Sequence, residues 1–99
     1  MIIECTAEGD VRLTEPSDFR KFKVFLKSNA SIESLAKSGI TVVDDGNALV
    51  PIALVPALPG RPTEGAWETA YADMVRKARD HGWIDDGANA IRAHIEREA

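Results

Sequence analysis

The sequence has few of the features that indicate a cellular compartment, such as paired cysteines, a secretory signal or a membrane span. It holds a single cysteine, Cys5, so no intramolecular disulfide can form. A lone thiol without a secretory signal suits a reducing compartment, and we therefore expect a cytoplasmic protein with Cys5 as a small buried hydrophobe. No apolar run approaches the roughly 20 residues of a membrane span, so we expect no membrane partner.

Motifs for catalysis or cofactor binding are also absent from the sequence. The chain has no glycine-rich dinucleotide or phosphate loop, no Cys-x-x-Cys pair, no serine elbow and no His-Glu-x-x-His. The residues do not resemble those of a characterised family. We therefore expect no cofactor, and function has to be argued from the chemistry of individual positions.

Basic residues are in the minority. Twelve lysines and arginines stand against sixteen aspartates and glutamates, which gives a formal net charge of −4. A nucleic-acid-binding surface needs clustered cations to displace counterions. The nearest cluster, diluted by Glu15 and Asp18, consists of Arg20, Lys21, Lys23 and Lys27. Without exposed aromatics between its members it is typical of a solvated face, so no nucleic acid is expected as a partner.

The residues that are present suit one α+β domain. The 99 residues, 44% of them hydrophobic, match a single domain spanning 1–99. Strands are predicted where β-branched residues gather, at 1–7, 11–13, 40–43 and 48–52. We expect a small antiparallel sheet with one long helix packed on it.

Three segments have the apolar spacing of amphipathic helices. The strongest covers about 64–81, and Gly82 follows where a left-handed residue would end it. Two shorter helices are predicted at about 16–28 and 31–38. The first of these depends on Pro16 near a helix start and on phenylalanines three residues apart.

One short pattern occurs twice. Residues 42–49 read VVDDGNAL, and residues 83–91 read WIDDGANAI. Asp, Asn and Gly are what tight turns need, whereas the spacing does not match a calcium-binding loop. We therefore predict two turns and no metal site. The repetition also favours a strand for 88–98, although Ala, Arg and Glu would suit a helix there.

A strand at 88–98 would create a candidate acid–base site. Arg92, His94 and Glu96 would then project from the same face. A carboxylate can orient an imidazole and raise its basicity, while a guanidinium can hold an anion. A solvated face of alternating charge explains the same residues, and a helix would separate them.

A second candidate site lies along the long helix. Large side chains there would wall a pocket for an apolar ligand: Trp67, Tyr71, Met74 and Trp83. The same helical spacing is what a core stripe needs, so burial in the core is the competing interpretation.

Three functions follow from these features, in this order. The first is a non-catalytic interaction or regulatory domain, an accessory subunit or a homodimer, in which Leu54, Val55 and Leu58 meet a protein partner. The second is a small-molecule-binding domain with the apolar pocket. The third is a small enzyme that uses His94 as a general acid or base.

Overall fold

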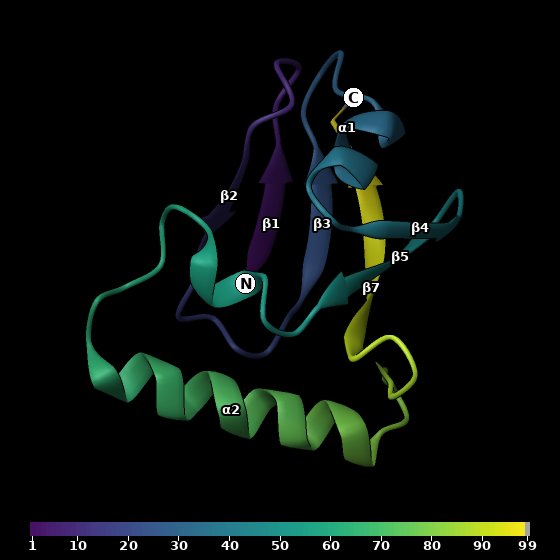
Figure 1. Ribbon diagram of the computed structural model, residues 1–99. Helices are drawn as coiled ribbons and strands as arrows, with labels where there is room; N and C mark the ends of the chain where they lie inside the picture. Colours follow the sequence, from purple (N-terminus) through teal and green to yellow (C-terminus); the bar gives the residue numbers. More distant parts are fainter. Residues whose placement is uncertain (99) are drawn as a thin grey trace.

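A mixed β-sheet organises the chain (Figure 1). The computed structural model describes residues 1–98. Its seven strands are β1 (Ile2–Cys5), β2 (Val11–Thr14), β3 (Lys23–Leu26), β4 (Thr41–Asp44), β5 (Asn47–Pro51), β6 (Ile84–Asp85) and β7 (Ala90–Arg97). The main path across the sheet is β2-β1-β3-β7-β5-β4, and β6 pairs with β7 beside that path. The predicted α+β class is confirmed.

The strand β7 lies between β3 and β5. It runs parallel to β3 and antiparallel to β5, so that His94 faces Lys23 on one side and Asn47 on the other. Ile91 and Ile95 are buried while Arg92 and His94 are exposed. The prediction of a strand with this alternation is confirmed, and the helical alternative for the segment is wrong.

The helix predicted at about 16–28 is wrong. Residues 15–22 form turns and irregular backbone, and β3 begins at Lys23. The strand β3 pairs with β1 on one side and with β7 on the other, and its Val24 and Leu26 are buried. Pairing on both edges outweighs the local apolar periodicity, which cannot report contacts with distant strands.

The sheet is also larger than predicted and not antiparallel throughout. The strand β3 is parallel to both of its neighbours, whereas β1–β2, β4–β5 and β5–β7 are antiparallel pairs. The antiparallel strand β2 returns the chain to the end of the sheet where β1 begins, since Thr14 pairs with Ile2. The turns of residues 15–22 then cross this end from β2 to β3, which starts beside Ile2 and runs parallel to β1.

The helices agree with the remaining predictions. They are α1 (Ile32–Lys37), α2 (Gly65–Asp80) and the short 3₁₀ turn η1 (Val55–Ala57). Figure 1 shows α2 lying across one end of the sheet. Within residues 1–98, no helix is both long and apolar enough to cross a membrane.

The helix α2 ends in a Schellman motif. Gly82 has a φ of 79°, its N–H donates to the Arg79 carbonyl at 3.0 Å, and the Trp83 N–H donates to the Ala78 carbonyl at 2.9 Å. Both bonds satisfy carbonyls that the helix end would leave unpaired. The motif fixes the direction in which the chain leaves α2, and with it the position of Trp83.

One face of the sheet forms the core. Its buried side chains are matched across the strands by register: Ile3, Cys5, Val24, Leu26, Ala48, Val50, Ile91, Ala93 and Ile95. Leu35 of α1, Val55 of η1 and Trp67 of α2 belong to the same apolar cluster. The opposite face of β7 is left to the charged residues.

Both Asp-Asp-Gly segments are turns, as predicted. Asp44 Oδ1 accepts a hydrogen bond from the Gly46 N–H at 2.9 Å in the β4–β5 hairpin. Asp85 Oδ1 accepts one from the Ala88 N–H at 2.9 Å between β6 and β7. The loops differ in length, because Asp44 pairs with Asn47 whereas Asp85 pairs with Ala90. Asp44 and Asp85 therefore accept hydrogen bonds from backbone N–H groups within their own turns.

The loop between β5 and α2, which contains Pro56, Pro59 and Pro62, covers the free edge of β2. The Leu13 N–H donates to the Pro59 carbonyl at 2.8 Å, so this edge group is paired. Gly60 follows with a φ of 95°, and a Cβ at this position would lie 2.3 Å from the Leu13 carbonyl oxygen. Only glycine fits such a close approach of two backbone segments.

We predict that Gly60→Ala lowers the free energy of unfolding by at least about 2 kcal/mol, because the loop has to leave β2. Gly65→Ala is the control, since a Cβ at Gly65 meets nothing within 4 Å. Urea denaturation of both variants measures the difference. If Gly60→Ala and Gly65→Ala had equal free energies of unfolding, the close approach of Gly60 to the Leu13 carbonyl would be wrong.

Glu98 joins the segment after β7 to the segment after β3. Its carboxylate accepts hydrogen bonds from the Ser28 N–H at 3.0 Å and Ser28 Oγ at 2.8 Å, and it pairs with Lys27 Nζ at 3.0 Å. The backbone bond from Ser28, followed by the hydroxyl and Lys27, lowers the pKa of Glu98 to about 2.

We predict that Glu98→Gln destabilises the protein at neutral pH and not in strong acid. A carboxyl with a depressed folded-state pKa stabilises the fold above its ordinary pKa of 4.5, and this contribution is lost as the pH falls toward about 2. Thermal melts of the variant, the wild type and the control Glu33→Gln from pH 7 downward measure it. If the melting temperatures of Glu98→Gln and wild type differed by the same amount at every pH, the depressed pKa of Glu98 would not contribute to stability.

Candidate ligand-binding groove

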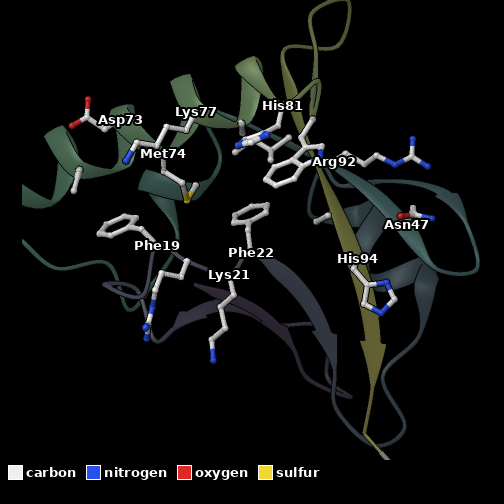
Figure 2. A pocket seen from close by; sticks show the side chains of 16 residues that line it. Phe19, Lys21, Phe22, Asn47, Asp73, Met74, Lys77, His81, Arg92 and His94 are labelled. Carbon is white, nitrogen blue, oxygen red and sulfur yellow. The ribbon is translucent and has the colours of Figure 1, made fainter.

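A groove of about 810 Å³ opens between α2, β7 and the turns of residues 19–22 (Figure 2). Its lining consists of Phe19, Arg20, Lys21, Phe22, Asn47, Ala70, Asp73, Met74, Lys77, Ala78, His81, Trp83, Ile91, Arg92, Ala93 and His94. Clefts that bury small organic ligands have volumes of roughly 300–1,000 Å³. We call this hollow the groove.

The groove unites residues from both predicted sites. Met74 and Trp83, from the predicted apolar pocket, line it together with Arg92 and His94, from the predicted acid–base site. Figure 2 shows Met74 on the α2 side and His94 on the β7 side. Glu96 and the pair Trp67 and Tyr71 are not part of its lining.

Trp67 and Tyr71 belong to the core behind the groove. Trp67 is 4% exposed, and its indole N–H donates to the Pro16 carbonyl at 2.8 Å. The two rings stack with centroids 5.2 Å apart, and the Tyr71 hydroxyl donates to the Ile52 carbonyl at 2.8 Å. Burial raises the pKa of Tyr71 far above its ordinary value. These side chains fasten α2 to the preceding loops and so hold one wall of the groove in place.

Trp83 is an exposed aromatic residue with a fixed backbone. Its side chain is 54% exposed, and its ring stacks on the His81 ring at a centroid distance of 4.7 Å. Its N–H is held by the helix end, and its carbonyl accepts a hydrogen bond from the Arg92 N–H at 2.8 Å. The indole therefore stands at the groove with its backbone tied to both α2 and β7.

The turns of residues 19–22 supply a wall that the sequence pattern did not reveal. Phe19 and Phe22 pack partly against the core and also line the groove. The Met1 amino group donates to the carbonyls of Asp18 and Lys21, the latter at 2.8 Å. These bonds hold the turn in place. The spacing of the phenylalanines was used only to predict a helix, so the place of Phe19 and Phe22 in the groove was missed.

The groove is rich in cations although the protein is acidic. Four of its lining residues are basic and one is acidic: Arg20, Lys21, Lys77 and Arg92, against Asp73. His81 and His94 add two imidazoles. A cleft lined mainly by one sign of charge concentrates the field inside it.

The acid–base arrangement is only partly formed. Arg92, His94 and Glu96 do project from one face of β7, but the Glu96 carboxylate accepts a hydrogen bond from Lys23 Nζ at 2.7 Å. That bond holds the pKa of Glu96 below its usual value. Among residues 1–98, no hydrogen bond joins His94 to Glu96, so this carboxylate does not orient the imidazole for proton transfer.

Other reactive groups do not add a site. Cys5 is fully buried, and burial raises the pKa of its thiol, which opposes formation of the nucleophilic thiolate. In the part of the chain that the structure describes, no three His, Cys, Asp or Glu side chains gather as metal ligands. The groove is thus the place where basic, imidazole and aromatic side chains come together.

Comparisons with known proteins add no family to these observations. No protein-family model matches the chain, and neither the curated proteins nor the solved structures searched contain a match.

We predict that the two tryptophans differ sharply in their effect on stability. Trp67→Ala removes a buried ring and a hydrogen bond and should cost about 3–5 kcal/mol, whereas Trp83→Ala should cost about 1 kcal/mol or less because its ring is half exposed. Chemical denaturation measures both values. A large loss at Trp83 would mean that its ring belongs to the core.

Proposed function

We propose that this domain binds a small organic molecule in the groove without transforming it. The observation that carries the proposal is the exposed Trp83 ring, fixed at a groove whose other walls include Phe22 and Met74. Apolar surface left in contact with water costs about 25 cal/mol per Å², so a ligand that covers these side chains gains free energy.

The rigidity of the groove supports the same conclusion. The Trp83 backbone is hydrogen-bonded to Ala78 and Arg92, and the turn that carries Phe19 and Phe22 is held by the Met1 amino group. A site that is ordered before binding loses little conformational entropy when a ligand arrives. Binding therefore needs no large rearrangement of the walls.

The distribution of apolar residues favours a small ligand over a protein partner. Val55 is buried, and Leu54 and Leu58 pack against the core, so the loop that suggested a partner surface is already covered. Within residues 1–98, the large apolar side chains left exposed are Val43 and Trp83, and of these Trp83 lines the groove. Homodimer interfaces are more apolar than the rest of a protein surface, and two exposed apolar side chains favour such an interface less than they favour a small ligand at the groove.

We predict that small apolar probes shift the Trp83 indole N–H signal in ¹H–¹⁵N spectra and leave the Trp67 signal in place. The probes are 1-octanol, octanoate and octyltrimethylammonium, and Trp83→Phe assigns the two signals. Trp67 is an internal control because its indole N–H is buried and bonded to Pro16.

A pair of variants on α2 locates the binding. Ala70 lines the groove and Ala72 is exposed on the same helix outside it, so Ala70→Phe should abolish the shifts and Ala72→Phe should not. If none of the three probes moves the Trp83 signal, or if Ala70→Phe binds like wild type, the proposal is wrong.

A further inference from the structure

We infer that the ligand is an organic anion, an apolar body that carries a carboxylate or a similar acidic group. The inference rests on the proposed function and specifies the chemistry of the ligand. It comes from the charges around the groove, where basic side chains gather in a protein whose formal net charge is −4.

The carboxylate in the lining is already engaged. Asp73 pairs with Arg76 at 3.1 Å, and Arg76 lies outside the lining. Both side chains are at least half exposed, so Arg76 offsets the charge of Asp73 only in part, as the acidic partners of two lining cations do for those cations. Four cations still outnumber this one carboxylate in the lining. A cationic ligand would find no unpaired carboxylate among the lining residues that the structure describes.

Two of the four cations have acidic partners. Arg20 pairs with Asp18 at 3.4 Å, and Lys21 pairs with Glu15 at 3.0 Å. These pairs are largely solvated, with Arg20 itself 93% exposed, so they hold their charges weakly. They add to the positive field without defining a contact point.

The other two cations have no such partner. Among residues 1–98, neither Lys77 nor Arg92 forms an ion pair. Lys77 lies on α2 and Arg92 on β7, so each of two walls of the groove carries a cation without an ion-pair partner in this part of the chain (Figure 2). The Asp44 carboxylate, whose pKa is lowered mainly by the Gly46 N–H and also by Arg92, offsets part of the Arg92 charge. Both cations add to the positive field that an anion meets at the groove.

One neighbouring polar group suits an acidic head as well. Asn47 and His94 are opposed across β5 and β7, and both line the groove. The Asn47 amide already donates to Asp44 Oδ1 at 3.0 Å, whereas the imidazole of His94 can donate an N–H to a carboxylate oxygen of the ligand. The apolar body of the ligand would lie against Trp83, Phe22 and Met74, and its acidic group would face His94 and the cations.

The test compares three probes with the same eight-carbon chain and different head groups. Dissociation constants of octanoate, 1-octanol and octyltrimethylammonium come from titration of the Trp83 indole signal. We expect octanoate to bind about tenfold more tightly than octyltrimethylammonium, with 1-octanol between them. Raising the ionic strength should weaken octanoate binding and leave 1-octanol unaffected, since salt screens exposed charges.

Variants identify the cations that interact with the charged head group of the probe. Lys77→Gln and Arg92→Gln should each weaken octanoate binding roughly two- to fivefold and change 1-octanol binding less, because both residues line the groove but only octanoate is charged. Lys37→Gln, on α1 and outside the groove, is the matched control and should change nothing. The double variant Lys77→Glu with Arg92→Glu should reverse the preference toward octyltrimethylammonium.

The outcomes separate the two proposals. If 1-octanol and octyltrimethylammonium bind as tightly as octanoate, or if Lys77→Gln and Arg92→Gln behave like Lys37→Gln, the anionic class is wrong while the groove remains a binding site. If none of the three probes moves the Trp83 signal, both proposals are wrong.

Discussion

The groove depends on the buried indole of Trp67. This ring stacks on Tyr71 within α2 and donates its N–H to Pro16, immediately before the turns that carry Phe19 and Phe22. One side chain thus fastens together two of the three walls. Figure 1 shows α2 crossing the end of the sheet, and the Trp67 and Tyr71 rings tie the helix to Pro16 and Ile52 there. The groove lies beside this attachment, between α2 and β7.

The third wall follows from the position of β7 inside the sheet. Successive side chains of a strand point to opposite faces of the sheet, so the pleat that buries Ile91, Ala93 and Ile95 also exposes Arg92 and His94. The core and the charged part of the groove are therefore two faces of one strand. The Schellman motif then returns the chain from α2 to β6 and β7, and Trp83 stands where the walls meet.

Local patterns predicted the elements whose signals are complete within their own residues. The helix α2 has a long amphipathic stripe with Gly82 after it, β7 has strict alternation, and both Asp-Asp-Gly turns have the residues that turns require. The strand β3 could not be predicted in this way. Its four residues gain their stability from β1 and β7, which lie far away in the sequence, while the spacing of Phe19 and Phe22 imitates a helix.

The groove also combines features that the local sequence predicts with features that depend on distant contacts. Trp83, Met74, Arg92 and His94 were each identifiable from the sequence as a large side chain beside a helix or as a polar residue on a strand face. Their meeting in one groove was not, because it depends on how far α2 stands from the sheet. Trp67 and Tyr71 have the same residue types and spacing as a pocket wall, but the hydrogen bonds to Pro16 and Ile52 commit them to the core.

The proposed function requires that a ligand binds between α2 and β7. Paramagnetic broadening of backbone amide signals by an octanoate that carries a nitroxide tests this directly. We predict that amides of Met74 and Lys77 on α2 and of Arg92 on β7 broaden together, while those of Leu35 on α1 stay sharp. Broadening centred on α1, or spread evenly over the surface, would contradict it.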